Sequence, residues 1–235
     1  MLAAGLTLAI KMLQNHRRGY PWMISLPGGY QLSFLGFFIF TFGGGFDLTW
    51  HTLFGFEADM EALLSPAHLV LATGGFLLIT GPIRANQERM RASTHRNWGG
   101  QLPVILTVLF GLSIFTFFTQ FSNLYAHPST VIEGVQGGSS SQYFWDVTVL
   151  SYILIPTVVT MIFTLFAIKN LGLPVGSLTM VLFANALLMF ALGLGRGEGR
   201  YWLILLAPLA GGEQGAVLPG GPQKNFSKGR LLDWA

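Results

Sequence analysis

The stretch from Gly43 to Leu69 holds the residue types that could do chemistry in this chain. It contains four of the ten acidic residues and two of the five histidines, which are Asp47, Glu57, Asp59, Glu61, His51 and His68. Imidazole nitrogen combined with carboxylate oxygen is a donor set that suits zinc or another divalent transition metal. A carboxylate that does not ligate can serve as a general base or orient a ligating imidazole. The stretch therefore predicts a metal or catalytic site.

The spacing of these residues selects the candidate ligands. Asp47 and His51 are four residues apart, which places both side chains on one face of a helix. His68 follows much later, so it can reach them only from a second, antiparallel helix. We predict that His51, His68 and Asp47 bind a metal such as zinc. Asp47, Glu57 and Glu61 are the candidate catalytic carboxylates.

Helix-breaking residues divide the stretch as this arrangement requires. Gly55 and Pro66 are expected to separate two helices. Ser65 can cap the second helix, with Pro66 in the first-turn position where a missing N–H costs nothing. His68 then lies in the first turn, at the membrane boundary. Three consecutive glycines, 43–45, precede Asp47 and allow either a bend or a close approach of another backbone.

Two other interpretations of the same residues remain open. Asp47 and His51 could form one buried hydrogen-bonded pair that only ties helices together, with the remaining acids on a solvated interfacial face. A transporter or channel could instead use Asp47 and Asp146 as ion or proton sites. The polar residues in the middle of the predicted spans are only Ser, Thr, Asn and Gln, which argues against a charged pathway through the membrane.

The composition is that of an integral membrane protein. Of 235 residues, 51% are hydrophobic and only 10% are charged, and the mean hydropathy is +0.55. Soluble domains carry about 25% charged residues. The absence of cysteine excludes disulfides, zinc–thiolate sites and thiol nucleophiles. The net charge of +3 is expected to set orientation in the bilayer, since no nucleic-acid-binding motif is present.

Apolar runs near membrane-spanning length predict an all-α, polytopic helical bundle with about six spans, or a truncated seven. The predicted spans are a half-length Leu2–Leu13, then Leu32–Phe46, Pro66–Ile83, Pro103–Phe121, Val147–Ile168 and Val175–Leu194. A last apolar piece, Tyr201–Ala210, is too short to cross. We expect one transmembrane domain over 1–210 and a polar, Gly-rich, disordered tail over 211–235.

Basic residues gather in alternate loops of this topology. The first, third and fifth loops carry net charges of +3, +3 and +1, whereas the second and fourth contain only acidic residues. Positively charged loops stay in the cytoplasm. The N-terminus and the Gly43–Leu69 stretch are therefore expected on the outer side of a bacterial cytoplasmic membrane, together with His127 and Asp146.

This orientation predicts the outcome of cysteine labelling, for which the cysteine-free chain is a clean background. A membrane-impermeant thiol reagent added outside should label Asp59→Cys and leave Ser93→Cys unlabelled, because the arginine-rich loop that contains Ser93 stays inside. The reverse pattern would invert the topology.

The motif D-x-x-W-H-x-x-x-G-x-E, followed by S-P-x-H-L and G-P-x-R, resembles a group of uncharacterised bacterial multipass membrane proteins. The matching residues are Asp47, Trp50, His51, Gly55, Glu57, Ser65, Pro66, His68, Leu69, Gly81, Pro82 and Arg84. The resemblance covers Leu32–Leu194 and implies an integral membrane protein without assigning an activity. Members of this group continue with another complete helix beyond the point corresponding to Gly211, which favours a truncated seventh span.

A second resemblance is to the alkaline ceramidase and adiponectin-receptor superfamily, membrane hydrolases with a His/Asp/Ser zinc site. The present chain departs from that pattern because no histidine follows His127. The sequence thus predicts a membrane protein with an outward-facing Asp/His/Glu cluster. Its most specific interpretation is the metal site of a hydrolase for a lipid-like substrate.

Overall fold

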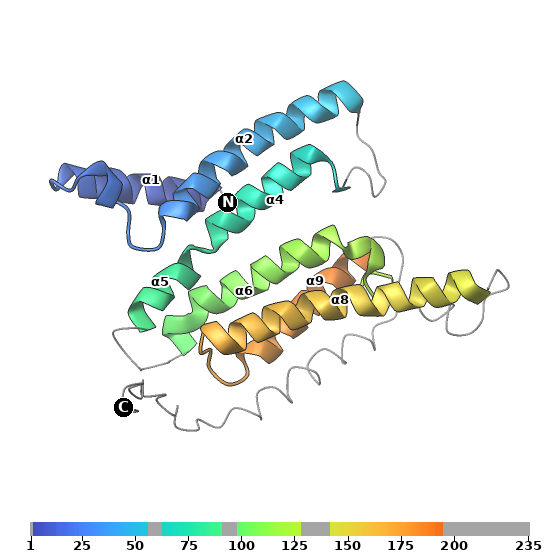
Figure 1. The fold of residues 1–235 in the computed structure, drawn as a ribbon. Helices are drawn as coiled ribbons and strands as arrows, with labels where there is room; N and C mark the ends of the chain where they lie inside the picture. The colour runs from blue at the N-terminus through green and yellow to red at the C-terminus, as the bar shows by residue number, and fades with distance from the viewer. Residues whose placement is uncertain (1, 56–62, 91–97, 128–141, 195–235) are drawn as a thin grey trace, which may run out of the picture.

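The computed structural model describes residues 2–55, 63–90, 98–127 and 142–194, and every regular element in these ranges is helical (Figure 1). The elements are α1 Leu2–Arg17, η1 Trp22–Ile24, α2 Gln31–Phe54, α4 Pro66–Ile79, α5 Gly81–Met90, α6 Trp98–Phe118, η2 Gln120–Ser122, α8 Gln142–Asn170 and α9 Ser177–Leu194. The predicted all-α class is confirmed. The Tyr201–Ala210 piece and the 211–235 tail lie outside the described residues.

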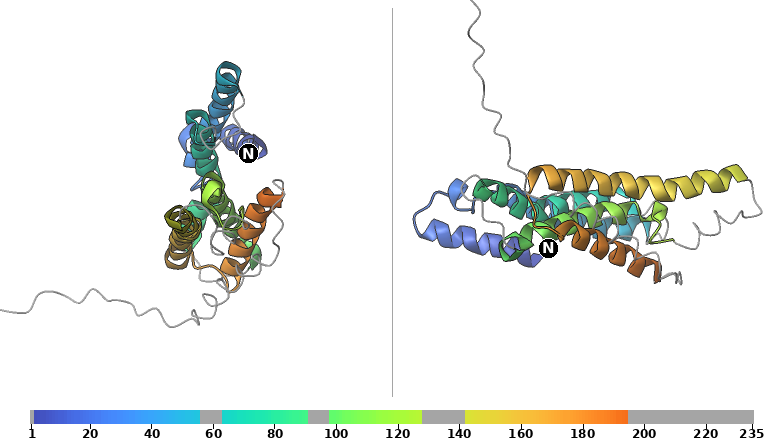
Figure 2. Two further views of the ribbon diagram at one scale, coloured as in Figure 1. Left: turned by 90° about the vertical axis from the view of Figure 1, so that its right-hand side faces the viewer. Right: turned by 90° about the horizontal axis from the view of Figure 1, so that it is seen from below.

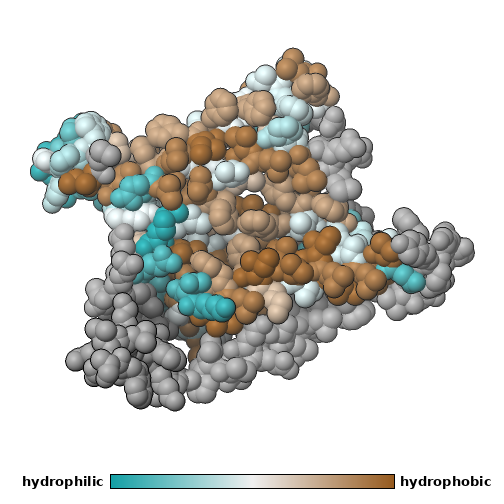
Figure 3. Space-filling model, in the orientation of Figure 1, coloured by the Kyte–Doolittle hydropathy of each residue, from teal (hydrophilic) through white to brown (hydrophobic). Residues whose placement is uncertain are grey.

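Four helical segments are long and apolar enough to cross a membrane. They are Gln31–Phe54, Pro66–Gln87, Trp98–Phe118 and Asp146–Asn170. The surface of the helical bundle is largely hydrophobic along the middle of these helices, with hydrophilic residues gathered at the end where α5 lies (Figure 3). Such a surface suits lipid and not water. The membrane class is therefore supported, and four of the six predicted spans correspond to helices long and apolar enough to cross a bilayer.

The other two predicted spans form shorter or less apolar helices. α1 extends to Arg17 and has 16 residues, and the apolar part of α9 is shorter than the four long segments. Several boundaries also differ from prediction. α8 begins at Gln142, before the predicted Val147, and α9 begins at Ser177, after the predicted Val175. The third span continues past Gly81-Pro82 as α5, because Pro82 occupies an early position where its missing N–H is not needed. The fourth begins before Pro103, at Trp98.

Glycines bring α2 and α4 into the most extensive helix–helix contact of the described fold. A Cβ added to Gly36 would lie 2.6 Å from the backbone nitrogen of Leu78. One added to Gly74 would overlap the backbone of Phe40. Small residues let helix backbones approach closely inside a membrane, where association depends on van der Waals packing and polar contacts. The two helices therefore form a tight antiparallel pair.

The remaining long helices form the principal hydrophobic core. Buried residues of α6, α8 and α9, and of the turn that follows α8, pack together, namely Val104, Ile105, Val108, Leu109, Leu112, Ala167, Leu171 and Val181. A polar contact joins α9 to α6, because Asn185 Nδ2 donates to Thr116 Oγ1 at 2.9 Å and to Ser113 Oγ at 3.1 Å. The helices α6, α8 and α9 lie beside the α2–α4 pair, as the view from one side and the view from below both show (Figure 2).

Candidate metal centre

One face of α2 leads from the glycine contact to the candidate site. Ser33, Gly36 and Gly43 are buried on α2, and steps of three, four and seven residues keep Asp47 and His51 on the same face. The face packs on α4, so its last two turns carry Asp47 and His51 toward the N-terminal end of α4. Of the three consecutive glycines, only Gly43 meets a neighbouring helix, and α2 continues through all three as one helix.

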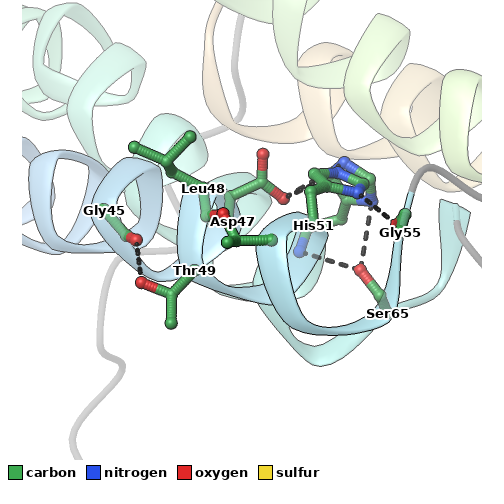
Figure 4. A network of polar contacts seen from close by, with 9 residues as sticks. Gly45, Asp47, Leu48, Thr49, His51, Gly55 and Ser65 are labelled. Carbon is green, nitrogen blue, oxygen red and sulfur yellow. Dashed lines mark hydrogen bonds and ion pairs between the residues drawn. The ribbon is translucent and has the colours of Figure 1, made fainter.

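The side chains of Asp47, His51 and His68 converge at this end of the pair. Figure 4 shows Asp47 and His51 beside Ser65, the residue that caps α4. Asp47 Oδ1 lies 3.6 Å from His51 Nε2 and 3.4 Å from His68 Nε2. The three candidate ligand atoms all lie within 4.8 Å of one another. Two ligands of a tetrahedral zinc ion, each about 2.0–2.1 Å from the metal, are about 3.3–3.4 Å apart. The oxygen–nitrogen separations are therefore close to those of a metal site.

His51 is oriented so that its Nε2 carries a lone pair toward Asp47 when the ring is neutral. α2 ends at Phe54, and Gly55 takes a φ of 84°, a left-handed conformation that favours glycine. His51 Nδ1 lies 3.1 Å from the Gly55 carbonyl oxygen. A carbonyl oxygen can only accept, so Nδ1 is the donor. This is the contact by which ligating histidines usually fix their tautomer and ring direction.

His68 is held by the cap of α4. Ser65 is the N-cap residue, and its Oγ accepts from the His68 backbone N–H at 3.3 Å. The same oxygen lies 3.1 Å from His68 Nδ1. One serine therefore begins the helix and also positions the imidazole, which leaves Nε2 directed toward Asp47.

The carboxylate between the rings is partly enclosed. The exposed fractions of the side chains are 22% for Asp47, 14% for His51 and 30% for His68. Asp47 Oδ1 itself is buried and accepts no hydrogen bond. A buried carboxylate oxygen without a donor is costly. A cation bound between Oδ1 and the two Nε2 atoms would supply the missing interaction.

The convergence of Asp47, His51 and His68 agrees with the prediction from their spacing. The rival interpretation of a simple hydrogen-bonded Asp47–His51 pair fits less well, because 3.6 Å exceeds a normal N–H···O distance. Glu57 and Glu61 lie outside the described residues. Asp146 is exposed on α8 and does not belong to the three-residue cluster. His127 packs edge-on against Tyr152 at a ring separation of 5.7 Å.

Sequence reasoning missed two of the groups that orient the ligands. The Gly55 carbonyl was expected only to end a helix, and Ser65 only to cap one. The signal for Ser65 was present, because a serine N-cap three residues before a histidine places both on the same turn. The signal for Gly55 was weaker, since it depends on the backbone angle after the helix end.

An apolar cavity is lined in part by His68. Its volume is about 500 Å³, and it lies between α2, α4, α6 and α9. Of its lining residues, only His68 and Ser113 are polar; the apolar ones include Phe40, Ala72 and Phe110. A group bound at His68 could therefore continue into a hydrocarbon-like space at membrane depth.

In comparisons with known proteins, no family model, curated protein or solved structure matches this chain. The resemblances inferred from the motif therefore stay predictions.

Ser65→Ala is expected to weaken both the helix end and the metal centre. Loss of the N-cap should lower the free energy of unfolding by about 1 kcal/mol. Loss of the oxygen beside His68 Nδ1 should lower metal affinity about 10–100-fold, as for other outer-shell partners. Metal titration and thermal unfolding in detergent measure the two effects. Thr52→Ala is the control, because Thr52 bonds only the Leu48 carbonyl in its own helix; equal metal loss in both variants would contradict the role of Ser65.

Proposed function

We propose that Asp47, His51 and His68 hold a divalent metal ion, with zinc the best fit to the donor set. The observation that supports this most directly is the approach of both Nε2 atoms to a buried carboxylate oxygen that accepts no hydrogen bond. Three protein ligands with an open fourth position are typical of catalytic zinc, whereas structural zinc usually has four. A bound zinc ion would supply Lewis-acid chemistry and an activated water.

The reaction class proposed is hydrolysis of a lipid-like substrate within the membrane. The cavity beside His68 favours a long apolar group, because its walls are almost wholly hydrocarbon. In this arrangement the cavity would bind the acyl chain and the residues around His68 would face the polar bond of the substrate. The centre lies where α2 ends and α4 begins, and its three side chains are partly exposed, so water and a polar headgroup have access to it. Figure 1 shows these two helix ends side by side.

The experiment that tests this function combines metal analysis with turnover of amphiphilic esters and amides. Protein purified without a histidine tag should contain about one equivalent of metal. It should release fatty acid from a long-chain substrate in mixed micelles, and a chelator should stop the release. Ala72→Phe should keep the metal and lose long-chain turnover, because Ala72 lines the cavity one helical turn from His68.

Leu69→Phe is the matched control for Ala72→Phe. It adds the same ring on α4, but the Leu69 side chain is exposed and lines neither this cavity nor the other one described below. Its long-chain turnover should equal that of the wild type. Metal-containing protein that hydrolyses no acyl ester or amide would overturn the hydrolase while leaving the metal site. Metal-free protein would overturn both.

A further inference from the structure

A second, larger cavity lies at the opposite end of the α4–α5 segment from the metal centre. It has a volume of about 570 Å³ and is enclosed by α4, α5, α6 and α8. Most of its wall is apolar, including Phe76, Val108, Phe115, Ile162, Phe163 and Phe166. Several of these side chains are also exposed on the outside of the bundle, and Ile162 is 61% exposed. The cavity therefore opens to the hydrocarbon of the bilayer.

One end of this cavity carries a cation. Arg84, on α5, lines it together with Thr80 and Gln87. Its Nε donates to the Gly29 carbonyl oxygen at 2.7 Å, and Nη1 donates to Thr80 Oγ1 at 2.9 Å. Nη2 donates to Ser33 Oγ at 2.9 Å, with a longer contact to the Leu77 carbonyl oxygen. These contacts hold the guanidinium in one orientation at the α5 end of the apolar space.

Every one of these partners of Arg84 is neutral. Among the described side chains, the ion pairs involve only Asp47, His51 and His68, so no described carboxylate balances the Arg84 charge. A guanidinium has five N–H donors. The bonds above use four at most, and the donor left over is on Nη1. A partly buried cation at a membrane boundary is costly without a counter-charge, so a bound anion would stabilise the Arg84 guanidinium.

We propose that this cavity binds an anionic phospholipid, with one acyl chain between α4, α6 and α8 and the phosphate at Arg84. The apolar walls match an acyl chain, and the uncompensated guanidinium matches a phosphate. Gln87, which is exposed at the same end, offers a further amide donor. Basic pockets between transmembrane helices recognise lipid headgroups in this way. Residues 84–101 carry a net charge of +3 in the sequence, which strengthens the local attraction for an anion.

The test is lipid selectivity in nanodiscs that contain equal amounts of palmitoyl-oleoyl phosphatidylglycerol and phosphatidylcholine. Lipids that stay bound to the protein on release from the nanodisc are counted by native mass spectrometry. The wild-type protein should retain phosphatidylglycerol about fivefold over phosphatidylcholine, the ratio expected for one basic residue near an anionic headgroup. No preference for the anionic lipid would overturn the proposal.

Four variants separate charge recognition from a structural role of Arg84. Arg84→Gln should lose the preference, and Arg84→Lys should keep most of it, although lysine cannot reproduce the contacts to Gly29 and Ser33. Equal preferences in the two variants would overturn the proposal. Ile162→Trp adds bulk to the α8 wall of the cavity and should reduce total lipid retention. Leu154→Trp, at an exposed α8 position outside the cavity, should not; equal retention in both tryptophan variants would also overturn it.

Discussion

Replacing either His51 or His68 with alanine should abolish stoichiometric metal, because each imidazole supplies one of the three candidate ligands found among the described residues. Asp47→Asn should lower metal affinity by at least the ~10–100-fold expected for loss of an outer-shell partner. Its effect should be larger if the carboxylate ligates directly. The measurement is elemental analysis of untagged protein after dialysis, followed by metal titration of the apo form.

His16→Ala is the control for these variants. His16 stacks on Trp22 at a ring separation of 3.8 Å, and its Nδ1 contacts the Tyr20 carbonyl oxygen. Its removal should leave metal content unchanged. The structural interpretation of the cluster predicts a different pattern, in which wild-type protein contains no metal. In that case His51→Ala would only destabilise the fold, by about 1–3 kcal/mol, since it removes one of the two imidazoles beside the buried Asp47 oxygen.

Gly74→Val should disrupt the metal centre from a distance. The valine side chain would collide with the backbone of Phe40, so α2 and α4 would have to move apart. Overpacking of this kind costs about 1–3 kcal/mol in free energy of unfolding. Because two ligands are on α2 and one is on α4, separation of the helices should also weaken metal binding strongly. Thermal unfolding in detergent and metal titration measure the two effects.

Gly44→Ala is the matched control for the glycine contact. Gly44 is also inside a long apolar helix, α2, but an added Cβ meets nothing within 4 Å. Its unfolding free energy should rise by up to about 1 kcal/mol through better helix propensity, and metal affinity should not change. Similar metal loss in Gly44→Ala and Gly74→Val would show that α2–α4 contact does not hold the site together.

The convergence of Asp47, His51 and His68 was predictable from the sequence, because it depends largely on local rules. The four-residue spacing of Asp47 and His51 fixes their shared face, while Ser65 and Pro66 fix where the next helix begins. Because the connection between the two helices is short, the second helix is expected to pack antiparallel to the first. The same local rules predicted helices at the positions of α2, α4, α6, α8 and α9.

What could not be predicted depends on contacts between distant segments. Nothing local indicates that Gly43 packs against α4 while Gly44 and Gly45 face open space. The position of Arg84 against Gly29 and Ser33 likewise requires the α2–α4 packing to be known. The continuation of the third span past Pro82 was missed because a Gly-Pro pair in a sequence usually indicates a helix end. Here Pro82 lies in the first turn of α5, where proline is tolerated.

All three candidate ligands come from two helices that follow one another in the chain and pack mainly on each other. The last of them, His68, is synthesised before any residue of α6, α8 or α9. During membrane insertion, the α2–α4 hairpin could therefore acquire its metal before the hydrophobic core of α6, α8 and α9 exists. Metal binding by the hairpin and packing of the later helices would then be separate steps. The ion would link α2 to α4 before α6 and α9 complete the cavity beside His68.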